Sequence, residues 1–159
     1  MKLMHSEWQD RVKHWVRTLR DDFYEPLGEI RWEAFRTMDH LSPEEALQGH
    51  FTSAEPGFIW GKTWEYCWFK GTVILPKAAE GKRIVMNLDA GGESTVFVNG
   101  KAFGNYRAAW VDEPHQFIED NCLAVSGKEG DIYEILMETY AGHFYPEAPT
   151  GGCATGPVL

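Results

Sequence analysis

Residues 60–101 read WGKTWEYCWFKGTVILPKAAEGKRIVMNLDAGGESTVFVNGK, and this stretch decides the fold class. Its β-branched and aromatic runs, interrupted by proline and glycine, predict three consecutive strands at residues 63–75, 83–89 and 93–98. The pair Asn99-Gly100 then predicts a tight hairpin, because a type I′ turn needs positive φ at both central residues. The middle of the chain is therefore expected to be an antiparallel sheet.

Composition bounds the class of protein. A chain of 159 residues, 43% of them hydrophobic, can bury one core of ordinary domain size. The formal net charge of −9 argues against nucleic acid and anionic membrane surfaces as partners. The three cysteines are odd in number and form no CxxC pair, so we expect reduced thiols. The first residues lack the apolar core of a signal peptide, and no apolar run approaches the ~20 residues that span a bilayer, which favours a cytoplasmic location.

The N-terminal segment predicts an amphipathic helix that begins after Ser6. Its apolar positions follow helical spacing, and we expect the resulting stripe to be buried: Trp8, Val12, Trp15, Val16 and Leu19. A short strand with one wet face is predicted at residues 29–34, where apolar and charged residues alternate. Ser42-Pro43-Glu44-Glu45 is a capping box with proline at the first helical position, and it predicts a second helix of barely two turns that ends near Gly49.

The first long strand, at residues 63–75, has an apolar phase that slips near Trp68. Tyr66 and Trp68 occupy even positions, whereas Phe69 and Val73 occupy odd ones. Either a β-bulge re-aims the face, or both faces are covered, with the N-terminal helix as the obvious cover for one of them. The sequence leaves both alternatives open.

The remainder of the chain supports an all-β fold. Residues 102–117 are aromatic and aperiodic and are expected to form a long structured loop, whereas residues 131–140 predict a strong strand. We expect an antiparallel β-sandwich or jelly roll with one N-terminal amphipathic helix and one short helix. Residues 1–50 are expected to pack as a helical and extended segment on a sandwich of residues 51–159. The Gly- and Pro-rich end, AGHFYPEAPTGGCATGPVL, is typical of an interior passage of a longer, multidomain chain.

Two motifs carry a family resemblance. The first is W-G-x6-W-F-x-G-T-V-x-L-P from Trp60, and the second is G-K-R-x-V-x-x-L-D-x-G-G-E-x-x-V-x-V-N-G from Gly81, followed later by ETYAGHF at residues 138–144. Together they resemble the N-terminal β-sandwich of bacterial and fungal α-mannosidases of glycoside hydrolase family 38. The Val-x-Val-Asn-Gly core is also shared by galactose-binding-like jelly rolls at the front of other glycosidases. The resemblance implies a jelly roll.

The resemblance also implies a function for a longer parent chain. In that family the catalytic domain lies downstream and is implied to hold zinc in an Asp and His cluster, with an Asp nucleophile and an acid/base carboxylate for retaining hydrolysis of α-mannosides. None of those motifs occurs in this chain, so no catalytic residue is carried over. We expect a non-catalytic accessory domain without a cofactor of its own. Its implied partner is the parent's catalytic domain, and α-mannoside glycans and a second subunit are further candidates.

The candidate contact residues are aromatic and basic. Sugar rings stack their C–H faces on flat side chains, although packing in the core or against a neighbouring domain is the more frequent role of aromatic residues. The candidates for a loop that faces substrate or the catalytic domain are Trp60, Trp64, Tyr106, Arg107, Trp110 and His115. Asp89 and Glu93 flank a Gly-Gly turn and are interpreted as turn residues rather than a catalytic pair. The spacing of His115, Cys122, His143 and Cys153 matches no zinc template.

Overall fold

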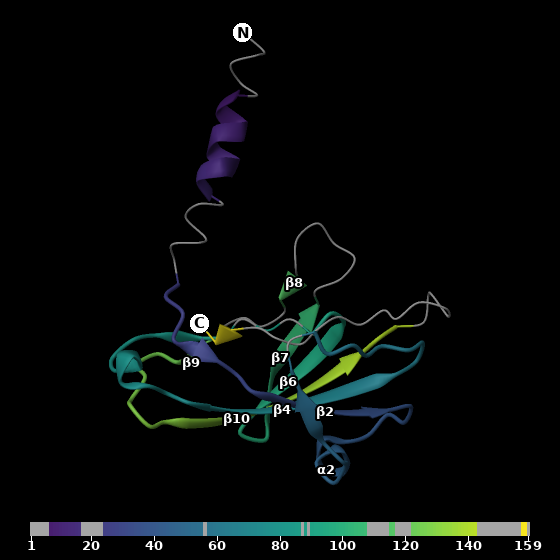
Figure 1. The fold of residues 1–159 in the computed structure, drawn as a ribbon. Coiled ribbons are helices and arrows are strands. Elements are labelled where there is room, and N and C mark those ends of the chain that lie inside the picture. Colours follow the sequence, from purple (N-terminus) through teal and green to yellow (C-terminus); the bar gives the residue numbers. More distant parts are fainter. Residues whose placement is uncertain are drawn as a thin grey trace.

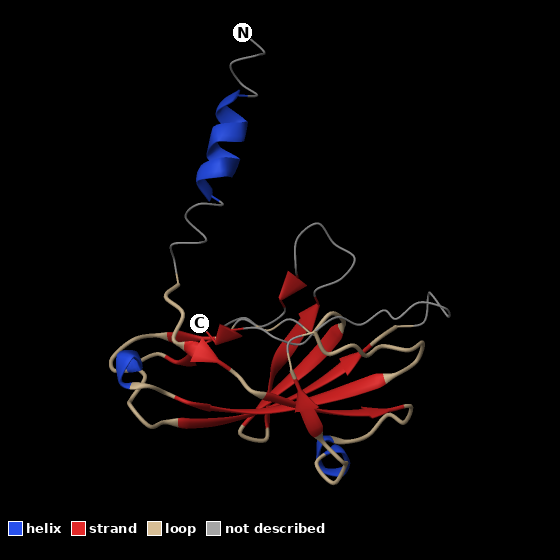
Figure 2. Ribbon diagram, viewed as in Figure 1, coloured by secondary structure: helices blue, strands red, loops and turns tan. Residues whose placement is uncertain are grey.

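The computed structural model describes residues 7–16, 24–55, 57–86, 88, 90–107, 115–116, 122–142 and 157–158. Strands are the main regular elements among these residues, and the helices are few (Figures 1 and 2). All strand pairs are antiparallel, as the sequence predicts. The described residues therefore form an antiparallel β-fold of the jelly-roll type.

The largest sheet has seven strands. Their order is β3-β2-β4-β10-β6-β7-β8, with bounds Thr52–Ala54, Trp32–Thr37, Tyr66–Ile74, Ile132–Tyr140, Glu93–Val98, Lys101–Arg107 and His115–Gln116. Two small sheets accompany it, one pairing β1 (Gly28–Glu29) with β11 (Pro157–Val158) and the other pairing β5 (Ile84–Val85) with β9 (Cys122–Ala124). The described helices are residues 7–16, α2 (Pro43–Ala46) and the single 3-10 turn η1 (Lys77–Ala79). The seven-stranded sheet draws strands from both sides of residue 50.

The strongest sequence signals are confirmed. Strand β6 occupies residues 93–98 as predicted, and Asn99 and Gly100 have φ of +50° and +73°, as a type I′ turn requires. Predicted strand 131–140 appears as β10, while the described part of predicted strand 83–89 is extended only at β5. Residues 102–107 correct the expected loop, because they lie in β7 and pair with β6 along its length.

The main core lies between the inner face of the seven-stranded sheet and the segment around β5. The sheet contributes Cys67, Phe69, Val96, Ile135 and Met137, and the facing segment contributes Ile84, Met86, Leu88 and Ala90. Strand β2 adds Trp32 and Ala34, whereas the charged Glu33 between them stays exposed. This alternation is the wet face that the sequence predicts for residues 29–34.

The slip in apolar phase near Trp68 has a physical explanation. Strand β4 pairs with β10 and β2 in unbroken register, so no bulge re-aims its side chains. Instead both faces are covered there: Phe69 enters the main core, and Trp68 enters a second cluster on the outer face. That cluster contains Ala46 of α2, with Leu41 and Phe51 from the segments that flank this helix. The cover is α2, and the expectation that the N-terminal helix covers β4 is wrong.

The N-terminal helix itself forms over residues 7–16, shown in purple in Figure 1. The sequence predicts that its apolar stripe is buried. In the structure the described members of this stripe are exposed: Trp8, Val12, Trp15 and Val16. The described strands do not bury them, so helical spacing correctly predicts the stripe but not its environment. Leu19 and the capping residue Ser6 lie outside the described residues.

Candidate functional site

A buried carboxylate closes the turn that leads into β4. The side chain of Glu65 is 8% exposed and accepts hydrogen bonds from the backbone N–H groups of Gly61 and Lys62 at 2.8 and 2.9 Å. The guanidinium of Arg36 in β2 donates to Glu65 Oε1 from Nε at 3.0 Å and from Nη2 at 2.8 Å. Hydrogen bonds that involve charged groups are roughly twice as strong as neutral ones. The turn is therefore fixed to the sheet.

The electrostatics of Glu65 reflect this network. Burial is the largest single influence and acts to raise the pKa of Glu65. Hydrogen bonds from Lys62 N–H, from Arg36 and from Gly61 N–H, together with the charge of Arg36, outweigh it and lower the pKa below its usual range. Glu65 is thus an ionised anchor whose acceptor capacity is used within the fold.

The anchored turn presents Trp64 to solvent. Trp64 has φ of +67°, a left-handed conformation that is a genuine outlier for a bulky residue. Such strain costs about 1–3 kcal/mol and persists only where the surroundings determine it. Here the Trp64 N–H donates to the Gly142 carbonyl at 2.9 Å, and Ala141 N–H donates to the Glu65 carbonyl at 3.0 Å. The Trp64 side chain remains 56% exposed, so the strained turn does not serve to bury it.

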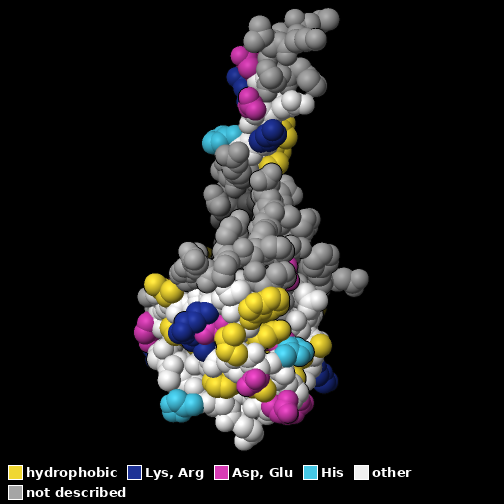
Figure 3. Space-filling view, turned by 90° about the vertical axis from the view of Figure 1, so that its right-hand side faces the viewer, with side chains coloured by type: hydrophobic (Ala, Val, Ile, Leu, Met, Phe, Trp, Pro, Cys, Tyr) yellow, Lys and Arg dark blue, Asp and Glu magenta, His cyan; other side chains and the backbone are white. Residues whose placement is uncertain are grey.

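Trp64 ends a series of ring contacts that we call the aromatic row: His40, Tyr66, Tyr140 and Trp64. The ring centroids of His40 and Tyr66 are 5.4 Å apart, those of Tyr66 and Tyr140 are 5.0 Å apart, and those of Tyr140 and Trp64 are 6.5 Å apart. Tyr66 and Tyr140 face each other directly in the β4–β10 register. Figure 3 shows hydrophobic side chains gathered beside histidine and acidic side chains on the side of the sandwich that lies on the right in Figure 1.

A second carboxylate lies beside the aromatic row. The side chain of Glu138 in β10 is 16% exposed, and its Oε1 lies 3.4 Å from Nε2 of His40. Among the described residues this buried oxygen has no hydrogen-bond donor. Burial raises the pKa of Glu138, and the neighbouring His40 acts weakly in the opposite direction. Glu138 thus has acceptor capacity that the described fold does not use.

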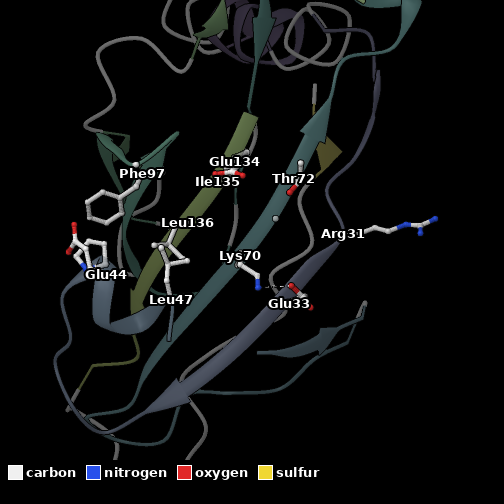
Figure 4. A pocket seen from close by; sticks show the side chains of 13 residues that line it. Arg31, Glu33, Glu44, Leu47, Lys70, Thr72, Phe97, Glu134, Ile135 and Leu136 are labelled. Atoms are coloured by element: carbon white, nitrogen blue, oxygen red, sulfur yellow. Dashed lines mark ion pairs between the residues drawn. The ribbon is translucent and has the colours of Figure 1, made fainter. Parts of the chain in front are cut away.

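A separate groove of about 590 Å³ lies on the outer face between α2 and the sheet (Figure 4). Lys70 and Glu33 from adjacent strands form an ion pair of 2.9 Å within it, while Leu47 of the α2 segment and Leu136 of β10 supply apolar surface. The Lys70 ammonium also lies 4.5 Å from the centre of the Phe51 ring. The Lys70 cation is thus engaged on two sides, and Arg31, Glu44 and Glu134 add further charged groups to the lining of the groove.

The structure separates the residues that the sequence proposes for a contact surface. Trp60 is a correction: its side chain is 1% exposed, its Nε1 donates to the Ala90 carbonyl at 3.2 Å, and its ring packs edge-on against Phe69 in the main core. Its position between Gly57 and Gly61 suggests a loop, but the chain turns inward there. Trp64 is the predicted aromatic that the described structure leaves exposed.

The predicted shared loop is only partly described. Tyr106 and Arg107 lie in β7, and His115 lies in β8, where it pairs with Arg107 in the backbone register. Arg107 in turn pairs with Glu93, the cross-strand neighbour of Tyr140. Trp110 lies outside the described residues. Backbone pairing therefore aligns Tyr140, Glu93, Arg107 and His115 across neighbouring strands of the sheet.

Sequence reasoning missed His40, Tyr66, Tyr140 and Glu138. Tyr66 and Tyr140 stand at the ends of the two longest strands, which was the one available signal.

Among the described residues no group of three His, Cys, Asp or Glu side chains could hold a metal ion. No helix in the described part of the chain is long and apolar enough to span a membrane.

The fold and the comparisons together define the class. A seven-stranded antiparallel sheet packed on the segment around the small β5–β9 sheet is a β-sandwich domain of the jelly-roll type. The family model described as alpha-mannosidase, jelly roll domain, matches residues 29–141, and the chain belongs to this family. The expected fold class and the resemblance to α-mannosidases of glycoside hydrolase family 38 are thereby confirmed.

Two relatives give the scale of the similarity. Alpha-mannosidase 2C1 of Homo sapiens is 32% identical over 108 residues, which cover 57% of this chain and 10% of that protein. Alpha-mannosidase 2C1 of Mus musculus is 29% identical over 83 residues, which cover 52% of this chain and 8% of that protein. The chain thus aligns with about a tenth of the length of these relatives.

Proposed function

We propose that this chain is the non-catalytic accessory domain of a longer α-mannosidase-like glycoside hydrolase, and that it positions or seals the catalytic domain of the same parent chain. The observation that carries the proposal is the jelly-roll family match over residues 29–141. The relatives support it, because they bear the name alpha-mannosidase and are many times longer than the matched segment. Hydrolysis of α-mannosides would then be the work of the parent protein.

The metal of the parent belongs to another domain in this proposal. The family resemblance implies zinc in the catalytic domain, where it would polarise the substrate and orient it. The described residues offer no cluster of ligands that fits a metal ion, so no step of the reaction is assigned to them. In this proposal the chain supplies a contact surface for the catalytic domain, and the sheet and the Glu65 hydrogen bonds keep that surface in place.

Deletion and add-back test the proposal. The parent enzyme, the parent lacking residues 1–159, and the 159-residue chain alone are assayed for hydrolysis of p-nitrophenyl α-D-mannopyranoside. We expect no hydrolysis by the chain alone, a large loss of activity or thermal stability on deletion, and partial restoration when the chain is added in trans. Hydrolysis by the isolated chain, or a deleted parent with unchanged activity and stability, would contradict the proposal.

Subunit contact is a second candidate role, favoured by the exposed apolar stripe of the N-terminal helix. Four large apolar side chains on one helix form a surface of the kind that protein interfaces cover: Trp8, Val12, Trp15 and Val16. Analytical ultracentrifugation of the wild-type chain and of a Val12→Glu, Val16→Glu double variant tests this role. A wild-type dimer that becomes a monomer in the variant supports it, and a wild-type chain that is already a monomer refutes it.

A further inference from the structure

We propose that the groove between α2 and the sheet receives the N-terminal helix, residues 7–16, of a second copy of this chain, so that two copies exchange their helices. This inference rests on the subunit contact proposed above and names the surface that the helix meets. The dimer contains two identical contacts related by a two-fold axis, which is the commonest symmetry of soluble homo-oligomers.

The helix presents an apolar stripe with a cation beside it. Trp8, Val12 and Trp15 recur at the spacing of one helix face, and each is more than half exposed. Arg11 lies between the two tryptophans in sequence, and its guanidinium is 5.8 Å from the centre of the Trp8 ring. Figure 1 shows this helix apart from the sheet, so the chain does not fill its own groove. Amphipathic helices of this kind bind by laying their apolar face into a hydrophobic groove.

The groove offers an apolar wall of matching character. Leu47 beside α2 and the sheet residues Leu136 and Phe97 line it and lie near one another in Figure 4. Leu47 is 50% exposed, so part of this wall is open to an incoming side chain. The groove volume of about 590 Å³ lies within the range of about 300–1,000 Å³ that is typical of binding pockets. The groove therefore has room for the tryptophans of the stripe.

The charges of the two surfaces are complementary. Glu44 and Glu134 line the groove, are exposed and form no ion pair with another described residue. Lys70 is already paired within the groove, and Arg31 extends away from the other labelled side chains (Figure 4). Carboxylates are thus the charges that the groove offers to a helix, and Arg11 beside the stripe is their counterpart. Opposite charges at such positions fix the register and the choice of partner.

The lengths of the two surfaces also agree. The stripe from residue 8 to residue 16 is about 12 Å long at 1.5 Å per residue. On the outer face of β10, Leu136, Glu134 and Ile132 follow one another over about 13 Å. Ile132 is 58% exposed and faces Ile74, which is 64% exposed, in the β4–β10 register. A helix laid along β10 therefore meets apolar side chains at both ends and a carboxylate midway.

The buried area explains why the exchange is reciprocal. A fully covered tryptophan buries about 150–250 Å², and the two indoles of the stripe are 61% and 64% exposed. With its two valines, one docked helix removes about 300 Å² of its own surface from water and about as much of the groove. Two such contacts bury about 1,200 Å², which reaches the lower bound for specific interfaces, whereas a single contact does not.

Charge reversal tests this contact, with the dimer dissociation constant of the 159-residue chain measured by analytical ultracentrifugation. We expect a wild-type dimer. Arg11→Glu and Glu134→Arg each place like charges opposite one another in both contacts and should raise the dissociation constant at least about tenfold. An equimolar mixture of the two variants should restore the dimer, because each helix then meets a groove of opposite charge.

Asp39→Arg is the matched control for Glu134→Arg. It makes the same change of charge at an exposed carboxylate that does not line the groove, so the dissociation constant should stay as in the wild type. Circular dichroism of the three variants checks that each keeps the fold.

The possible failures are distinguishable. A wild-type chain that is a monomer refutes both this inference and the subunit contact. A dimer that is lost in the Val12→Glu, Val16→Glu double variant but unchanged in Glu134→Arg refutes the groove as the receiving surface and leaves the subunit contact standing. Single variants that stay monomeric when mixed also refute the helix–groove contact. The accessory role is independent of these results, because deletion of residues 1–159 from the parent tests it separately.

Discussion

Replacement of Glu65 by alanine is expected to be the most damaging single change in the turn before β4. It leaves the buried Gly61 N–H without its acceptor, which costs about 1–3 kcal/mol, while the Lys62 N–H can turn to water. The lost pairing with Arg36 adds only about 1 kcal/mol, because the Arg36 side chain is 39% exposed and can be hydrated. The total is about 2–4 kcal/mol, which corresponds to a fall in Tm of about 10 °C for a chain of this size.

Thermal unfolding by circular dichroism measures this loss. Glu33→Ala is the matched control, because Glu33 also belongs to an ion pair with a basic residue of a neighbouring strand but is half exposed. It should change the free energy of unfolding by no more than about 0.5 kcal/mol. If Glu65→Ala and Glu33→Ala have the same Tm, the buried network contributes nothing to stability and does not anchor the turn that carries Trp64.

Three further changes test other parts of the fold. Gly92→Ala should destabilise by about 1–3 kcal/mol, because its Cβ would lie 2.6 Å from the Tyr140 carbonyl oxygen, whereas Gly28→Ala, with nothing within 4 Å, should be silent in urea unfolding. Glu138→Gln should flatten the pH dependence of stability: burial raises the folded-state pKa of Glu138, so its stabilising contribution is full below the unfolded-state pKa and is lost as pH rises through the folded-state value. The variant should therefore gain Tm over wild type toward neutral pH, and parallel curves would contradict this. Ser42→Ala should cost about 1 kcal/mol, since it removes the acceptor for the Glu45 N–H, and an unchanged urea midpoint would show that α2 does not depend on its cap.

Local signals in the sequence predicted local structure well. Asn99-Gly100 encodes positive φ directly, and the capping box from Ser42 to Glu45 forms with both of its hydrogen bonds. Strand β6 is bounded by turns on both sides, so its limits could be read without knowing its partners. These features depend on residues within a few positions of each other.

Features that depend on distant contacts could not be predicted in the same way. Trp60 lies between glycines and near a proline, which are loop signals, but its burial depends on Phe69 and Ala90. The double cover of β4 depends on α2 lying across Trp68, which no periodicity within β4 can show. Likewise His40 meets Glu138 only because β2 and β10 both flank β4.

The position of β10 has a consequence for how the chain folds. β10 is the last strand of the seven-stranded sheet to be synthesised, yet it lies between β4 and β6 and pairs with both along most of its length. Until residue 140 has left the ribosome, β4 and β6 each keep an unpaired edge, and such edges invite pairing with other chains. Closing the sheet therefore requires inserting a late strand into its centre, a non-local step of the kind that folds slowly. Nascent chains that end before β10 should be the most aggregation-prone species of this domain.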